Sequence, residues 1–108
     1  MVTQIRKRDA VAAALPIRLF RALSDPNRIA LVAWLALQRQ PRTVSEIVDS
    51  GCCPVDFSVV SRHLHVLHEA GAVVAERHGR EVRYQLPAAA LAKTLRTIAD
   101  AIDRCCKE

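Results

Sequence analysis

The sequence predicts a mainly helical fold with one β-hairpin near its carboxyl end. Over most of the 108 residues, apolar side chains recur every three or four positions, which is the period of amphipathic helices. Between residues 73 and 86 the period changes to two, which is typical of half-buried strands. A chain of this length forms one small domain with a modest core. We therefore expect a single domain over residues 1–108 that associates as a homodimer.

Three helices are predicted in the first third of the chain. The first covers residues 3–13. The second covers residues 15–23, and its apolar stripe consists of Leu15, Leu19, Phe20 and Leu23. The third begins after a cap at Ser24 or Asp25 and continues to about residue 37. We expect this helix to be largely buried through Ile29, Leu31, Val32, Trp34 and Leu35.

Two further helices follow, joined by a turn that contains glycine. The segment Thr43–Glu46 matches a capping box and opens a short helix. After a turn at residues 50–54, a longer helix covers about residues 57–70, with Asp56 or Ser58 as its cap. A short helix, a tight turn and a second helix form the helix-turn-helix layout.

The longer helix has two faces of different chemistry. Its buried stripe consists of Val60, Leu64 and Leu67. Its opposite face carries Ser58, Ser61, Arg62 and His65. A helix that only faces solvent usually carries Glu and Lys there, whereas a helix in the DNA major groove needs short donors and acceptors. We therefore interpret this helix as a DNA recognition helix, with an ordinary surface helix as the alternative.

The period-two segment forms a basic hairpin. Its strands cover residues 73–77 and 82–86, and Gly79 suits the tip because glycine readily takes a positive φ. The arginines that make the hairpin basic are Arg77, Arg80 and Arg83. Such a hairpin is usually only solvated, but directly after a recognition helix it is placed to grip a phosphate or the minor groove. Residues 73–86 therefore predict the wing of a winged helix-turn-helix.

A final helix covers about residues 88–106. Its apolar stripe consists of Leu91, Leu95, Ile98, Ala99 and Ile102. So small a domain has too little core to cover this stripe, and a second copy of the chain is the natural partner. We therefore expect this helix to be the dimerisation helix.

The composition favours a nucleic-acid partner. Net charge is +5 and the pI is about 9.5, and most of the cations are arginines, which bind phosphates through a planar fork. No long apolar run or secretory signal is visible, so we expect a cytoplasmic protein with no membrane partner. No Ser-His-Asp order, glycine-rich phosphate loop or catalytic carboxylate pair occurs, so we expect no enzymatic activity.

The four cysteines occur as two adjacent pairs, Cys52–Cys53 and Cys105–Cys106. Adjacent cysteines rarely form a disulfide with each other, and structural disulfides are rare in the cytoplasm. A pair can instead supply two thiolates to a soft ion: arsenite and antimonite bind three sulfurs, mercury two or three, and cadmium four. We expect the first pair to be accessible in its turn. Cysteines that only fill space are the alternative interpretation.

The segments ALSDPNRIALVAWL at 22–35, SVVSRHLHVLHEAGAV at 58–73 and RHGREVRYQL at 77–86 resemble the ArsR/SmtB family of bacterial metal-responsive winged-helix repressors. The resemblance covers nearly the whole chain from Leu19 onward. It implies a homodimeric transcriptional repressor that leaves its double-stranded operator DNA when a metal, metalloid or oxidant modifies cysteine or histidine sites. The expected DNA contacts are Ser58, Val59, Ser61, Arg62 and His65 in the major groove, with Arg77 and Arg80 on the wing.

The chain also departs from the best-known members of this family. Arsenic sensors place Cys-Val-Cys in the short helix, where this chain reads VSEIVDS, and zinc sensors pair Asp with His on the final helix, where this chain has Asp100 and Asp103 without histidine. Neither familiar ligand set is present, so the inducer must be inferred from the cysteines themselves. The two pairs favour As(III) or Sb(III), with Cd(II) or Hg(II) as alternatives and no obligatory cofactor. Its expected ligands are Cys52, Cys53, Cys105 and Cys106. A redox or sulfide switch through a disulfide between the pairs, and a protein-interaction module, stay open.

Overall fold

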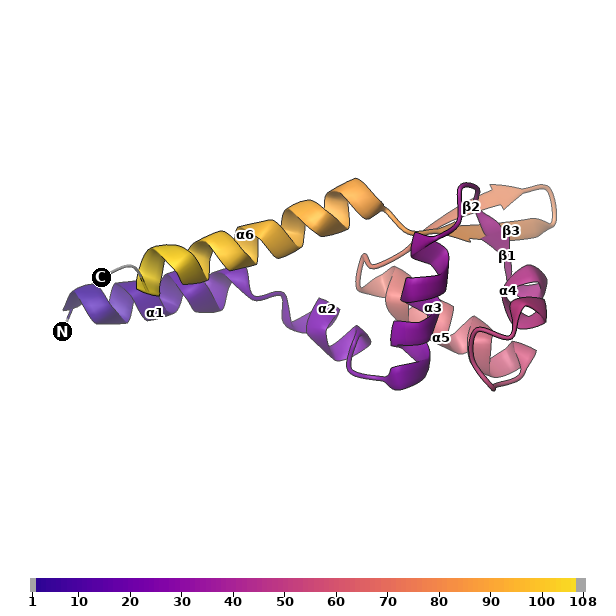
Figure 1. The fold of residues 1–108 in the computed structure, drawn as a ribbon, viewed down its shortest axis with the longest axis horizontal. Coiled ribbons are helices and arrows are strands. Elements are labelled where there is room, and N and C mark those ends of the chain that lie inside the picture. Colours follow the sequence, from indigo (N-terminus) through magenta and orange to yellow (C-terminus); the bar gives the residue numbers. More distant parts are fainter. Residues whose placement is uncertain (1, 107–108) are drawn as a thin grey trace. The chain divides into compact units, whose positions relative to one another are not determined.

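The computed structural model describes residues 2–106, with side chains from residue 6 onward. This part of the chain contains six helices and three short strands (Figure 1). Among these residues, contacts define two compact units, one made of residues 2–17 with residues 88–106, the other of residues 18–87. A single domain over residues 1–108 stays a prediction.

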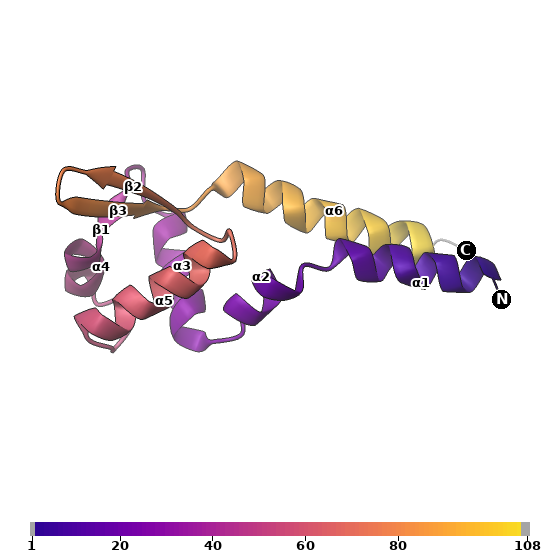
Figure 2. The same ribbon diagram turned by 180° about the vertical axis from the view of Figure 1, so that it is seen from behind.

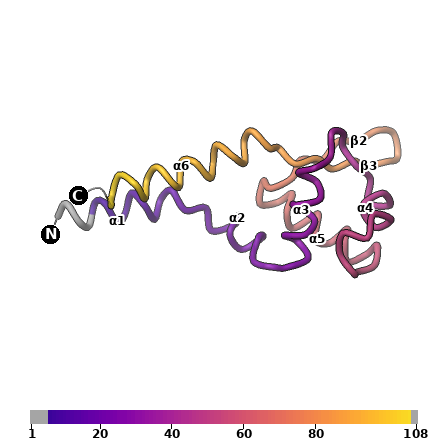
Figure 3. Tube along the Cα trace, viewed as in Figure 1, coloured from indigo at the N-terminus to yellow at the C-terminus, as the bar shows by residue number. Residues whose placement is uncertain are grey.

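The first unit is a pair of helices, α1 (Val2–Ala14) and α6 (Ala88–Cys106), which lie side by side and antiparallel (Figures 1 and 3). Of the predicted apolar stripe of α6, Ile98 is buried, whereas Leu95 and Ile102 are 46% and 44% exposed. A line of apolar side chains along α6 therefore stays uncovered in the single chain.

Residues 18–87 begin in α2 (Ile17–Ala22), which starts only after Pro16 and is shorter than the sequence predicts. Leu19 is buried as expected, but Phe20 is 42% exposed, so the prediction that Phe20 joins the buried stripe is wrong. A six-residue helix has only one narrow face to bury, and Leu19 and Ala22 occupy it.

The next helix, α3 (Pro26–Ala36), begins at Asp25, whose side chain accepts hydrogen bonds from the N–H groups of Asn27 and Arg28. Of the five side chains expected in the core, Leu31 and Leu35 are buried. Ile29 is 47% exposed, so fewer side chains of α3 are buried than predicted. The helix packs through one face rather than most of its circumference.

The helix-turn-helix consists of α4 (Val44–Ser50) and α5 (Phe57–Glu69). Thr43 and Glu46 form the predicted capping box at the start of α4. Asp56 is the cap of α5 and accepts a hydrogen bond from the Val59 N–H at 3.0 Å. The predicted stripe of α5 is confirmed, because Val60, Leu64 and Leu67 have no exposed surface.

The wing belongs to a three-stranded antiparallel sheet of β1 (Arg42–Thr43), β3 (Glu81–Gln85) and β2 (Val74–His78), in that order. His78 pairs with Glu81, so each strand extends one residue further toward the turn than predicted. The turn consists of Gly79, which has a φ of 65°, and Arg80. Helices α3, α4 and α5 lie together on one side of this sheet (Figure 2).

Strand β1 is absent from the sequence prediction. Thr43 pairs with Arg83 of β3 and also caps α4, so this one residue joins the base of the wing to the helix-turn-helix. The core between these elements consists of Leu31, Leu35, Ile47, Val60, Leu64, Leu67, Ala72 and Val73. Within the described residues, no helix is both long enough and apolar enough to cross a membrane.

Candidate nucleic-acid interface and thiol sites

The exposed face of α5 carries the side chains that the sequence predicts to contact DNA. Ser58, Arg62 and His65 are exposed, and Val59 and Ser61 are half-buried beside them. Because the opposite face is fully buried in the core, α5 is held rigidly with this polar face outward. The arrangement has the short donors and acceptors that base edges require.

The amino end of α5 is occupied by a carboxylate of the chain itself. Asp56 accepts from the Val59 N–H and from the Ser58 hydroxyl, each at 3.0 Å. These two hydrogen bonds, with the Val59 bond the larger cause, hold the pKa of Asp56 below its usual value. Asp56 is therefore ionised at neutral pH, so a negative charge already lies at the helix terminus where a phosphate could otherwise bind.

Arg28 fixes the position of α5 against two other helices. Its Nη1 lies 3.3 Å from Nδ1 of His63 on α5, and its Nε donates to the carbonyl of Ala22 at the end of α2. Sequence reasoning missed Arg28 and its contact with His63. One signal was available: a cation in the first turn of a helix is disfavoured by the helix dipole, so Arg28 needs a partner elsewhere.

The wing presents two of its arginines to solvent. Arg77 and Arg80 are exposed. Arg83 was expected to join them, but it is half-buried and lies opposite Glu76, so it points to the other face of the hairpin from Arg77. Its Nη2 donates to Glu81 at 3.3 Å. The predicted cluster of three is therefore wrong, because adjacent strand positions alternate between faces.

The first cysteine pair lies in the turn between α4 and α5. The two sulfurs of Cys52 and Cys53 are 3.9 Å apart. Sulfurs bound to one tetrahedral ion at about 2.3 Å would lie about 3.8 Å apart, so this spacing suits two ligands of one soft ion. Cys52 is half-buried, and its thiol also lies 3.9 Å from the carbonyl oxygen of Ile47.

The expectation that this pair is accessible is wrong for Cys53, which is 7% exposed. Burial, with a smaller contribution from the neighbouring Cys52, raises the pKa of the Cys53 thiol to about 11. The thiol is therefore protonated at neutral pH, and an ion that binds it must displace the proton.

The second cysteine pair ends α6. Cys105 is half-buried and donates to the Lys7 carbonyl at 3.6 Å, whereas Cys106 is exposed. Cys105 also lines a hollow of about 490 Å³ between α1 and α6, together with the cationic residues Arg6, Lys7 and Arg104. All four cysteines are free thiols, and the two pairs belong to different compact units.

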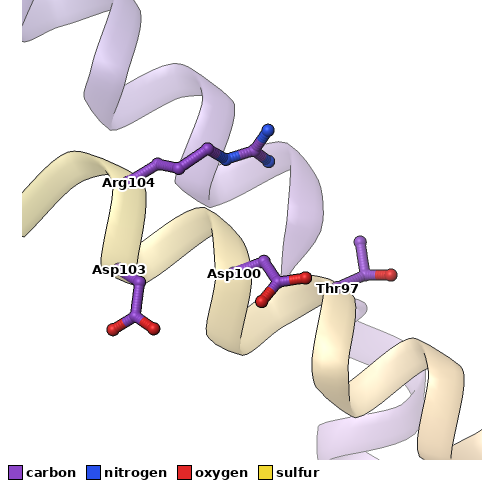
Figure 4. Close-up of a pocket in the computed structure, with 4 residues that line it drawn as sticks. All are labelled: Thr97, Asp100, Asp103 and Arg104. Carbon is purple, nitrogen blue, oxygen red and sulfur yellow. The ribbon is translucent and has the colours of Figure 1, made fainter.

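Two carboxylates on α6 are the remaining candidate ligands. Asp100 and Asp103 line a hollow of about 440 Å³ with Thr97 and Arg104, and they project from successive turns (Figure 4). Among the described residues, however, no three His, Cys, Asp or Glu side chains are grouped so that they could hold a metal ion. A complete site therefore needs a ligand beyond each of these pairs as they stand in one chain.

Together, the helix-turn-helix of α4 and α5 and the adjoining hairpin define a winged helix-turn-helix protein. No family model matches the chain. It is 48% identical over 68 residues to the HTH-type transcriptional repressor SmtB of Mycobacterium tuberculosis, covering 63% of this chain and 47% of that protein. It is 38% identical over 69 residues to a probable mercury resistance operon repressor of Streptomyces lividans, covering 64% and 52% of the two chains. The arsenical resistance operon repressor of Escherichia coli is 35% identical over 75 residues, covering 67% and 59%.

Solved structures extend the similarity over most of the chain. An ArsR-like transcriptional regulator from Rhodococcus sp. RHA1 is 31% identical with a TM-score of 0.65, covering 90% of this chain and 86% of that one. A homodimeric winged helix-turn-helix DNA-binding domain from Mycobacterium bovis is 26% identical with a TM-score of 0.59, covering 85% and 80%. The chain belongs to the ArsR/SmtB family of transcriptional regulators, which are not enzymes. It matches only about half the length of the curated relatives.

Proposed function

We propose that the protein is a homodimeric transcriptional repressor in the cytoplasm, which binds operator DNA and is released when a soft ion binds its thiols. One observation carries the DNA-binding part. The polar face of α5 is exposed opposite a completely buried stripe, and the wing beside it presents two exposed arginines. Family membership supports the same function.

The side chains of α5 and of the wing suit different kinds of DNA contact. On α5, Ser58, Val59, Ser61, Arg62 and His65 would read base edges in the major groove. On the wing, Arg77 and Arg80 would contact a phosphate or the minor groove, where bidentate guanidinium groups bind well.

The proposed dimer uses the uncovered face of α6. Leu95 and Ile102 are seven positions apart and both exposed, so they form an apolar line that a second copy would cover. Two-fold symmetry would then present two α5 helices to half-sites about one helical turn of DNA apart.

The leading inducer is arsenite or antimonite, held first by Cys52 and Cys53. The support is that the two sulfurs are 3.9 Å apart, close enough for both to bind one soft ion. The third thiolate would come from Cys105 or Cys106, of the same chain or of the second subunit. The turn that contains Cys52 and Cys53 leads directly into the cap of α5. Binding of an ion to this pair would therefore change the orientation of α5. Release follows only if the ion binds the DNA-free shape more tightly than the DNA-bound one.

Two alternatives keep the DNA-binding part and change the signal. Cadmium or mercury would use the same thiols with a different ligand number. A redox or sulfide switch would form a disulfide between the two pairs, and the exposed thiol of Cys106 is the one that an oxidant reaches most easily.

The test is a titration of the complex between the protein and its own promoter DNA, followed by fluorescence anisotropy. Arsenite, antimonite, cadmium, mercury, zinc and peroxide are added separately to wild type, C52S/C53S, C105S/C106S and the four-serine variant. We expect arsenite or antimonite to release wild type, and the C52S/C53S variant to stay bound. Release of the four-serine variant by the same ion would rule out a thiol site, and a protein that never binds the promoter would rule out the repressor.

A further inference from the structure

A groove of about 230 Å³ lies between α2 and the carboxyl-terminal half of α5. Its apolar lining residues are Ala22, Val66 and Ala70. Its remaining lining residues are polar or charged: Arg18, Arg21, His65 and Glu69. All of these residues belong to the compact unit of residues 18–87, which also contains α5.

The groove opens on the face of α5 that carries the proposed DNA contacts. His65 is both a groove residue and one of those contacts, and Glu69 follows it by one helical turn. The spacing from Ser58 to Arg62, His65 and Glu69 is four, three and four residues, which keeps all four on one side of a helix. Arg18 and Arg21 therefore flank the DNA-facing side of α5.

Both arginines are available for a partner outside the chain. Arg18 and Arg21 are exposed, and neither guanidinium has a hydrogen bond or ion pair to another residue in the described part of the chain. By contrast, Arg28 and Arg42 are held by hydrogen bonds within the same unit. The carbonyl of Arg21 accepts from the Ser24 hydroxyl at 2.7 Å, which fixes the end of α2 and leaves the side chain free.

We infer that Arg18 and Arg21 form a second phosphate-binding site, which grips the DNA backbone beside the major groove that α5 enters. This inference rests on the proposed DNA-binding function. A recognition helix contacts base edges mainly with its amino-terminal residues, so its carboxyl-terminal half lies nearer the phosphates that border the groove. In this half, Glu69 would repel a phosphate, and two guanidinium groups beside it reverse the sign of the local charge.

The amino end of α5 strengthens the argument, because Asp56 already fills the place where a helix terminus would bind phosphate. Anchoring on the backbone must then come from side-chain cations. The wing supplies the exposed residues Arg77 and Arg80, and α2 supplies Arg18 and Arg21 beside the carboxyl-terminal half of α5.

The test measures the affinity of the dimer for promoter DNA over a range of KCl concentrations. Each phosphate contact contributes about 0.9 to the slope of log K against log salt, so R18A/R21A should lower the slope by about 1.8 per subunit. R18Q and R21Q should each produce about half of this change. Arg39 is exposed in the loop after α3 and does not line the groove. R39Q removes the same single charge as R18Q or R21Q, so it is the control for the single variants and should change the slope little.

Discrimination between operator and mutated operator should stay the same in these variants, because phosphate contacts carry no sequence information. A wild-type slope in R18A/R21A would overturn this inference alone, as would a loss of base discrimination without a change of slope. Absence of salt-dependent promoter binding by the wild type would overturn both this inference and the repressor function.

Discussion

The thiol of Cys53 is buried three residues before the cap of the recognition helix. Binding of an ion to this thiol, as proposed, requires the loss of a proton that is held more tightly than in an exposed cysteine. The same burial connects the protonation state of one residue to the stability of the fold.

We therefore predict a specific loss of stability in alkaline solution. The pKa of Cys53 is about 11 in the fold, against an ordinary value of 9.0. Because the folded form holds the proton more tightly, the stabilisation is complete below pH 9 and is lost between pH 9 and about pH 11. Urea unfolding at pH 8 and pH 10 should show a larger loss for wild type than for C53A. Parallel losses in the two proteins would contradict this assignment.

The polar face of α5 could be read from the sequence, because helical spacing alone separates Ser58, Arg62 and His65 from the buried stripe. The burial of Cys53 and the contact of Arg28 with His63 could not. The two partners of that contact are 35 positions apart, and only the packing of α3 against α5 brings them together. Local composition suggested an open turn, whereas tertiary packing covers one of its two thiols.

Strand β1 has only two residues, yet it connects the wing to the helix-turn-helix. Its two residues pair with Tyr84 and Arg83, and Thr43 begins α4 at the same time. The Glu46 carboxylate completes the cap by accepting from the Thr43 N–H at 3.1 Å, and this bond is the largest cause that holds the pKa of Glu46 below its usual value. The wing and the helix-turn-helix thus share one junction.

We expect T43A to weaken this junction. Loss of the capping hydroxyl should lower the free energy of unfolding by about 0.5–2 kcal/mol, because the Glu46 N–H loses its acceptor. T43S keeps a hydroxyl and should stay close to wild type. Hydrogen exchange should also become faster in both α4 and β3 of T43A. Faster exchange in α4 alone would show that the wing does not depend on the cap.

Most of the helices and the hairpin were predictable from a hydrophobic period, and α3, α4 and α5 also begin at recognisable capping residues. Strand β1 was not, because two residues carry no period and become a strand only by pairing with β3. The arrangement of the arginines on the wing was not predictable either. The number of arginines on the hairpin is visible in the sequence, but the register that turns Arg83 away from Arg77 depends on a two-residue turn.

For the whole molecule, the exposed apolar line on α6 predicts how copies associate. Replacement of Leu95 and Ile102 by glutamate should convert the dimer to a monomer, because two charges would be buried in the interface. Lys93 lies about 160° around the helix from Leu95, so K93E is the matched control and should stay dimeric. Light scattering after gel filtration measures the mass. A dimeric L95E/I102E variant would exclude this face of α6 as the interface.

The carboxylate that caps α5 also has a consequence for how the molecule approaches a duplex. Many helices attract a backbone phosphate to their amino ends, whereas here Asp56 places a negative charge at that point. With the proposed DNA-binding function, the phosphates of a duplex should repel this end of α5. We therefore expect the attraction to the DNA backbone to come from arginines elsewhere in the chain.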